Sequence, residues 1–271
     1  MILPILRATV LLAAALAPAL AGAKSISITI QPAVEVKDGV LTARVQVANS
    51  GDDVAESVTP VLQFGERTAR AETSRSLGPN ESMTTPLSLQ VGTLAPGRWP
   101  YRLAVDYTDA NQYPFQALHV GLVTLGSTPP SKVAVSDLKV GPLSGSGSLA
   151  IRIKNLAAVP RQASLTIALP DGLEVTKPVE AVPLAAWEEA TVSVTIVNRT
   201  ALPGSRYPVF AAVEYDGDGV HQAAVAQAIV EIHASHSFFR IDNNLLWIVA
   251  GVLIVAWLGF MVRQITVRRA A

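Results

Sequence analysis

The sequence predicts an all-β protein: two tandem Ig-like antiparallel β-sandwiches followed by a single transmembrane α-helix. Three observations lead to this prediction. Between residues 24 and 234, apolar and polar residues alternate in many short runs, which is the pattern of half-buried strands. Turn-forming residues separate these runs, as they do in sandwich domains. Near the C-terminus, a stretch of 18 residues, Leu245 to Val262, carries no charge.

The first 23 residues have the features of a signal peptide. Arg7 supplies a positive charge, an apolar stretch follows from Ala8 to Leu20, and Ala21-Gly22-Ala23 offers small side chains to a signal peptidase. The apolar stretch is short for a membrane span. We therefore expect cleavage after Ala23, with Ala21 and Ala23 as the small residues of the cleavage site. The alternative is an uncleaved N-terminal anchor.

Residues 24–127 are predicted to form the first sandwich. Ile26, Ile28 and Ile30 share one face of a strand, because successive side chains of a strand point to opposite faces. Further alternating runs at 41–47, 83–89 and 101–107 are separated by turn residues at 49–52, 78–80 and 96–97.

Residues 132–234 are predicted to form the second sandwich, after a linker at 128–131. Pro129 and Pro130 favour an extended, semi-rigid connection between the two domains. The alternating runs of this half lie at 149–153, 165–169, 192–196, 209–213 and 223–232, and its turn residues lie at 170–172, 203–204 and 216–219.

The two halves look like copies of one another. In the first, Pro96-Gly97 leads into a strand that ends Val105-Asp106-Tyr107. About 108 residues later, Pro203-Gly204 leads into a strand that ends Val213-Glu214-Tyr215. A repeat of this length is a domain rather than a solenoid unit. Tyr107 and Tyr215 therefore occupy equivalent strand ends, where we expect corner tyrosines whose hydroxyls tie a loop to the backbone.

These motifs carry a family resemblance. Val45 to Asp52, Leu77 to Ser82 and Pro96 to Tyr101 resemble the CARDB-type bacterial adhesion-related sandwich. The second half is similar, through Asn155 and Leu165 to Val175, to the related sandwich found beside carbohydrate-binding modules in some α-galactosidases. It departs from that pattern at Leu156-Ala157-Ala158, where a turn like Asn-Ser-Gly is expected. The resemblance implies an Ig-like fold in a surface or envelope setting, and it brings no shared catalytic residue.

The C-terminal segment is predicted to anchor the chain. As a helix, residues 245–262 span roughly 27 Å, about the thickness of the hydrocarbon core of a bilayer. Residues 235–244 form a juxtamembrane segment and residues 263–271 a cytoplasmic tail, whose arginines keep that end inside. The residues that define the anchor are Leu245, Trp247 at the interface, Val262, Arg263, Arg268 and Arg269.

These signals predict a single-pass protein of a bacterial cytoplasmic membrane, with its body outside the cytoplasm. Without Arg7 and the three tail arginines, 17 of the 21 basic residues remain against 21 acidic ones, a net charge near −4. Such a surface excludes a basic stripe for nucleic acid. The chain has no cysteine, so no disulfide stabilises the exported body.

The sequence offers no candidate catalytic residue, cofactor site or metal site, and we expect no enzyme. Gly141 to Ser148 is rich in glycine and serine but does not fit Gly-x-Ser-x-Gly, and is interpreted as a loop. Asp216 and Asp218 are too few for a calcium loop and suit a hairpin turn. Of the four histidines, His119 is interpreted as structural, while His233 and His236 lack a third metal ligand nearby in the sequence.

Two tryptophans are the candidate contact residues. Trp187 stands between Ala186 and Glu188, where it is expected to be partly exposed, and Trp99 follows the Pro96-Gly97 turn of the first half. We interpret the chain as a membrane-anchored binding or scaffold protein that acts through protein–protein contacts, as an accessory subunit of an envelope complex or an adhesion-related module. The alternative is a carbohydrate-binding envelope protein in which Trp99 and Trp187 stack on sugar rings.

Overall fold

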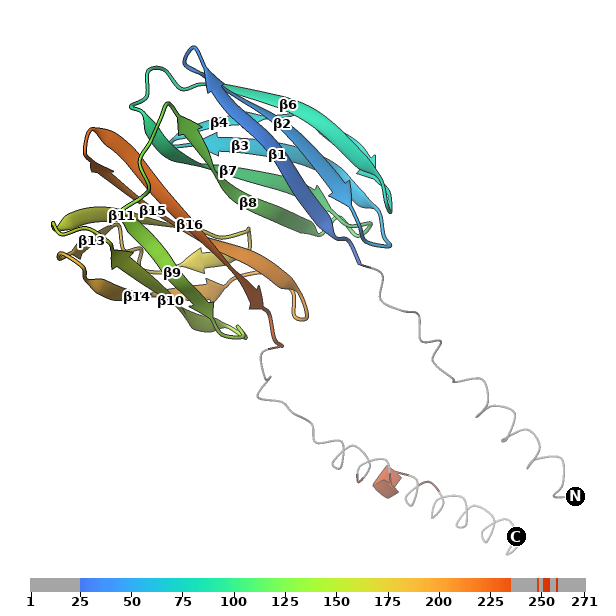
Figure 1. Ribbon diagram of the computed structural model, residues 1–271. Coiled ribbons are helices and arrows are strands. Elements are labelled where there is room, and N and C mark those ends of the chain that lie inside the picture. Colours follow the sequence, from blue (N-terminus) through green and yellow to red (C-terminus); the bar gives the residue numbers. More distant parts are fainter. Residues whose placement is uncertain (1–24, 235–247, 249–250, 254–256, 258–271) are drawn as a thin grey trace, which may run out of the picture.

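The computed structural model describes residues 25–234, 248, 251–253 and 257. Over these residues the protein is built from antiparallel strands stacked in sheets, so the predicted all-β sandwich architecture is confirmed. The strands divide into two halves, β1 to β8 and β9 to β16, and each half encloses a hydrophobic core of its own (Figure 1).

The first half has a three-stranded sheet, in the order β1-β2-β6, that faces a sheet built on β3, β4, β5, β7 and β8. Leu41, Val45, Leu62, Leu103 and Val105 are completely buried between these sheets. The alternating runs of the sequence explain this core, because every second side chain faces inward. The strands are β1 (Ile28–Lys37), β2 (Val40–Asn49), β3 (Ala55–Phe64), β4 (Arg67–Arg70), β5 (Ser74–Leu77), β6 (Ser82–Gln90), β7 (Gly97–Thr108) and β8 (Pro114–Leu125).

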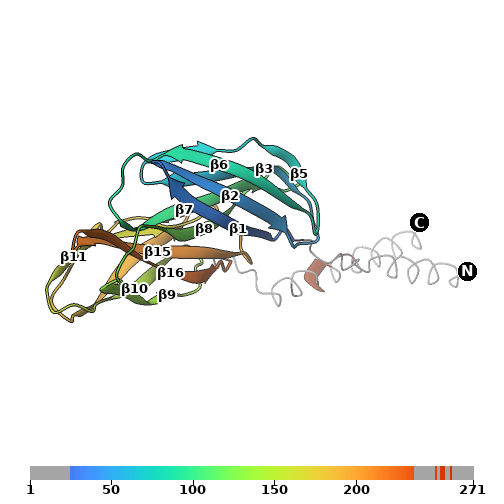
Figure 2. The same ribbon diagram turned by 45° about the horizontal axis from the view of Figure 1, so that its top comes forward.

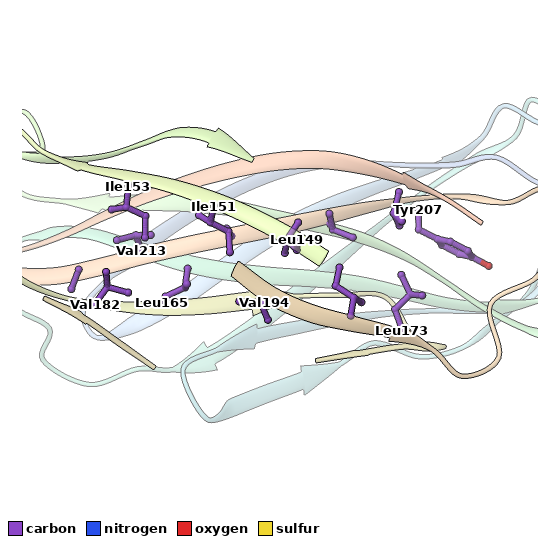
Figure 3. Close-up of a cluster of buried hydrophobic side chains, with 14 of the residues drawn as sticks. Leu149, Ile151, Ile153, Leu165, Leu173, Val182, Val194, Tyr207 and Val213 are labelled. Carbon is purple, nitrogen blue, oxygen red and sulfur yellow. The ribbon is translucent and has the colours of Figure 1, made fainter. Parts of the chain in front are cut away.

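The second half repeats this plan. The sheet β12-β14-β10-β9 faces the sheet β13-β11-β15-β16. Leu149, Ile151 and Ile153 of β10 point between the sheets, toward Leu165 and Val213 of the facing sheet (Figure 3). Val194 of β14 lies in the same core beside Leu149. The strands are β9 (Val133–Val140), β10 (Ser146–Asn155), β11 (Arg161–Ala168), β12 (Leu173–Val175), β13 (Ala181–Leu184), β14 (Glu189–Asn198), β15 (Arg206–Gly217) and β16 (Val220–Glu231).

The two halves lie against one another rather than apart, with β7 and β8 beside β15 and β16 (Figures 1 and 2). A third apolar cluster joins them, in which Ala104, Leu118 and Val120 meet Phe210. Strand β15 is therefore buried on both faces: Val209, Ala211 and Val213 enter the core of the second half, whereas Phe210 faces the first half. A strand covered on both faces has an unbroken apolar run instead of an alternating one. Residues 209–213 form such a run.

Both ends of the β-rich body meet at one end of the molecule (Figure 1). Strand β10 begins beside the end of β16, where Leu143 bridges Ile232, and it runs away from that point to Asn155. Ten strand residues extend about 33 Å. The loop after β10 therefore lies at the end opposite to the start of β1 and the end of β16.

The predicted terminal segments fall mainly on residues that the structure does not describe. The signal peptide (1–23) and the tail (263–271) lie wholly outside the described residues, as does most of the anchor (245–262). Within the described residues, none of the helices has the length and apolar character to cross a bilayer. Ile248, Gly251 to Leu253 and Trp257 have helical conformation, and the large side chains among them are 59 to 64% exposed.

Candidate functional site

Asn49 and Asn155 show that the two halves share one backbone frame. Asn49 is completely buried at the end of β2, where its Nδ2 donates to the carbonyls of Asp53 (2.7 Å) and Leu77 (3.1 Å). Asn155 is completely buried at the end of β10, and its Nδ2 donates to the carbonyls of Val159 (2.9 Å) and Ala185 (2.8 Å). Leu156-Ala157-Ala158, which departs from the family pattern, therefore alters the side chains of this loop but not the hydrogen bonds from the buried asparagine to the loop and to the neighbouring turn.

A turn beside each asparagine repeats the match. In the first half, the Gly78 N–H donates to the carboxylate of Glu81 at 2.7 Å. In the second half, the Ala185 N–H donates in the same way to Glu188. The third residue of each turn has a left-handed backbone: Asn80 has φ 60° and Trp187 has φ 61°. The two residues are therefore structural equivalents, although one is an amide and the other an indole.

Trp187 is an unusual residue for this position. Asparagine tolerates the left-handed region because its short side chain bonds locally, whereas a bulky residue there is strained by roughly 1–2 kcal/mol. The Trp187 side chain is 62% exposed, so burial in the core of its own domain does not explain the choice. Strain held at an exposed position is typical of functional sites.

Trp187 belongs to an exposed apolar surface that we call the apolar tip. It comprises two loops, Leu156 to Pro160 and Ala185 to Trp187, which are joined where the Trp187 N–H donates to the carbonyl of Ala157 (3.1 Å). Leu156 is 39% exposed and Val159 50% exposed. In the first half the equivalent loops read Ser50-Gly51-Asp52-Asp53-Val54 and Gly78-Pro79-Asn80, which are mostly polar. The frame does not require apolar residues here, since the bonds of the buried asparagine and of the turn glutamate form in the first half without them.

Trp99, the other candidate contact residue, lies at the junction between the halves. Its ring stacks on that of His221, with centroids 3.7 Å apart and planes inclined by 14°. Its Nε1–H donates to the carbonyl of Ala95 at 3.0 Å. The sequence gives no sign of this pairing, because Trp99 and His221 belong to different halves. The stacked His221 covers one face of the Trp99 indole, and a sugar ring would need a free indole face to stack on.

His221 is held by both halves. Its Nδ1 lies 2.8 Å from Asp216 and its Nε2 lies 3.1 Å from Glu214, while its backbone N–H donates to the carbonyl of Pro96 at 2.9 Å. Only 7% of the residue is exposed. Burial by itself would lower the pKa of His221, but the hydrogen bonds and charges of Glu214 and Asp216 outweigh it and raise the pKa above its usual value.

Gly97 makes this close approach possible. Strand β16 meets β7 through a single parallel bridge, in which His221 pairs with Gly97. A Cβ atom at Gly97 would lie 1.9 Å from the carbonyl oxygen of His221, well inside contact distance. The Pro-Gly motif of the first half therefore serves the junction. At Gly204, its counterpart in the second half, a Cβ would meet nothing within 4 Å.

The two predicted corner tyrosines have different surroundings. The Tyr215 hydroxyl accepts a hydrogen bond of 2.6 Å from the Lys132 N–H, so it ties the segment between the halves to β15, as expected. Tyr107 instead packs on Phe115, with ring centroids 5.5 Å apart. Burial, together with Tyr207 nearby, raises the pKa of Tyr107 to about 12. At the same end of the junction, Tyr113 donates to the carbonyl of Thr200.

The remaining candidates occupy structural places. His119 lies in β8 near Tyr101 and Phe210, and burial lowers its pKa. Asp218 sits in the left-handed turn between β15 and β16 and pairs with Arg161 at 2.9 Å. Among the described residues, no three His, Cys, Asp or Glu side chains are grouped closely enough to hold a metal ion. His233 lies 4.0 Å from Glu231, and His236 lies outside the described residues.

A cleft of about 580 Å³ opens between the halves. The first half contributes Gln63, Pro100 and Arg102 to its walls, and the second half contributes Ile167, Phe210 and Glu214, among others. Arg102 crosses the gap, because its guanidinium donates to the Leu169 carbonyl (3.2 Å) as well as to Gln116 (3.0 Å). The cleft adjoins the junction, since Glu214 both lines it and holds His221.

Comparison with known proteins gives distant structural likenesses. No family model matches the sequence, and no curated protein matches it. Similar solved structures include native Escherichia coli alpha-2-macroglobulin, 11% identical over 76% of this chain and 17% of that chain, with a TM-score of 0.28. Red sea bream transglutaminase is 13% identical over 74% of this chain and 31% of that chain (TM-score 0.25). The YadV chaperone is 17% identical over 74% of this chain and 99% of that chain (TM-score 0.31). The chain thus spans less than a fifth of the macroglobulin, and these likenesses assign it no activity or partner.

Proposed function

We propose that this protein is a membrane-anchored extracytoplasmic binding or scaffold protein, whose two Ig-like sandwiches contact another envelope protein through the apolar tip. It would serve as an accessory subunit of an envelope complex or as an adhesion-related module. The observation that carries the proposal is Trp187, a large apolar side chain that is exposed from a left-handed turn where the equivalent residue is Asn80.

The composition of the apolar tip supports a protein partner. Leu156, Val159 and Trp187 are large apolar side chains that water solvates poorly, and burying them against a partner contributes about 25 cal/mol for each Å² removed from water. Tryptophan is among the residues that dominate binding energy in protein interfaces. Their loops are fixed by the buried Asn155, so little conformational entropy is lost on binding.

The position of the apolar tip suits an anchored protein. It lies at the end of the body opposite to the start of β1 and the end of β16. If residues 245–262 cross the membrane, the body then presents this surface away from the bilayer. Ile248, Val252, Leu253 and Trp257 support the anchor, because they are helical and mostly exposed, and such apolar side chains favour lipid over water. The tail arginines favour a cytoplasmic C-terminus.

The turn motifs support membership of the CARDB-type adhesion-related sandwiches as part of the same proposal, and the signal peptide supports export. A carbohydrate-binding role is the weaker alternative. That role was predicted from Trp99 and Trp187 as exposed rings that stack on sugars. The Trp99 ring is already stacked on His221, so it is less suited to this role. Trp187 alone is left to stack on a sugar.

The test uses Trp187→Asn, which installs the residue that the first half has at this position. The full-length protein and the variant are crosslinked in native membranes and captured, with Asn80→Ala as the matched control in the other half. We expect one defined partner to be recovered with the wild type and with Asn80→Ala, and lost with Trp187→Asn although the unfolding temperature of that variant is not lowered. Recovery of the same partner with Trp187→Asn would show that the apolar tip is not the contact surface.

A further inference from the structure

We propose that His221 is a protonation-dependent latch that holds the two halves in one orientation and, when it loses its proton, lets the cleft between them widen. The proposal is independent of the partner at the apolar tip. It rests on the stacking of His221 on Trp99, on its two carboxylate partners, and on the single bridge between β7 and β16.

The charged imidazolium fits its surroundings better than the neutral ring. Protonated His221 donates one N–H to Asp216 and the other to Glu214, so both ring nitrogens are satisfied. A cation stacked on an indole gains a further attraction to the π-face of the ring. A neutral imidazole keeps one N–H only, so the lone pair of its other nitrogen faces a carboxylate. Loss of the proton therefore replaces an attraction with a repulsion.

Few other charges face the imidazole. Strand β15 contributes Glu214 and Asp216, strand β7 contributes the uncharged Trp99, and the preceding loop contributes the carbonyl of Pro96. Gln222 directs its amide to the carbonyl of Pro129, and Arg161 of β11 pairs with Asp218 in the turn between β15 and β16. The two carboxylates therefore decide the charge of His221.

The latch is placed to control the cleft. Glu214 holds the imidazole from one side and forms part of the cleft wall, so a change at His221 reaches the wall directly. The raised pKa sets the sign of the pH dependence. The stabilisation is complete below the unfolded value of about 6.5 and is lost as the pH rises through the higher folded value. Mild acidification thus tightens the junction.

The absence of cysteine allows a direct measurement. One cysteine replaces Glu66, next to the cleft residue Gly65, and a second replaces Lys177, two residues after the cleft residue Val175; both positions are exposed. The two cysteines carry spin labels on the full-length protein in lipid nanodiscs. We expect a narrow distribution of label distances at about pH 5.5 and a broader, longer one at about pH 8.5. In His221→Gln the distribution becomes independent of pH, whereas His119→Gln, at the same interface but without carboxylate partners, keeps the wild-type response.

A second readout protects the test against a misfolded variant. With 5-fluorotryptophan, the Trp99 signal, assigned by its loss in Trp99→Phe, is expected to titrate with a midpoint above about pH 6.5. In Glu214→Gln/Asp216→Asn the midpoint falls below the wild-type value. A wild-type distance distribution that is the same at both pH values, or a response that survives in His221→Gln, would overturn the latch.

Discussion

Trp187 occupies the left-handed position of a turn whose counterpart in the first half is filled by Asn80, with φ 61° and 60°. In both turns a buried asparagine donates to the carbonyl that precedes the turn, Leu77 or Leu184, and a glutamate carboxylate accepts the first N–H of the turn. The first half therefore serves as an internal control for the second, because the same backbone frame carries a polar surface in the first half and an apolar surface in the second.

Replacing Trp187 with asparagine is expected to stabilise the isolated protein. Asparagine adopts the left-handed backbone with less strain than tryptophan, and the difference in strain energy is roughly 1 kcal/mol. Chemical denaturation measures the free energy of unfolding. The converse change, Asn80→Trp, is expected to destabilise by a similar amount, and a loss of stability in Trp187→Asn would mean that the indole packs usefully on its own domain.

Removing either buried asparagine is expected to be strongly destabilising. Asn49→Ala leaves the carbonyls of Asp53 and Leu77 and the N–H of Gly51 without their partner, and Asn155→Ala does the same in the second half. We expect a loss of about 2–4 kcal/mol for each, since a buried unpaired polar group costs about 1–3 kcal/mol. Asn198→Ala, which changes a partly exposed asparagine at the end of β14, serves as the control and should lose about 1 kcal/mol. Equal losses for all three would contradict the role given to the frame.

Gly97→Ala is expected to separate the halves at the junction. Its Cβ would overlap the carbonyl oxygen of His221, and forced overpacking costs about 1–3 kcal/mol. Amide exchange of His221, whose N–H is bonded to Pro96, should accelerate. Gly204→Ala has space for a Cβ and is the matched control. It should leave exchange at His221 unchanged, and a similar acceleration in both variants would show that the overlap is not the cause.

Tyr215→Phe is expected to loosen the segment that joins the halves. The Lys132 N–H loses its acceptor, which should cost about 1 kcal/mol and raise the rate of proteolysis between residues 126 and 132. Tyr107→Phe is the control, because the Tyr107 ring packs on Phe115 and the segment is not attached to it. Protease resistance that is unchanged in Tyr215→Phe would show that the segment is held by other contacts.

The strands and turns can be predicted from the sequence, whereas most of the contacts at the junction and at the apolar tip cannot. Period-two runs predict the cores, and Asp216 to Gly219 predicts a hairpin turn, because those residue types suit turn geometry locally. Packing between the halves is signalled by the unbroken apolar residues 209–213, so the prediction of an alternating run at these residues is wrong. The pairing of Trp99 with His221 joins residues distant in sequence, and no local pattern encodes it. The apolar tip becomes visible once Asn49 and Asn155 align the halves.

The most direct test of the contact surface compares equivalent positions in the two halves of one protein. A photo-crosslinking amino acid is placed at Val159 in the apolar tip or at Asp53, its equivalent in the first half, in cells that express the full-length protein natively. The account predicts a light-dependent adduct of one defined mass from position 159 and none from position 53. Adducts of equal yield from both positions, or an adduct from position 53 alone, would contradict it.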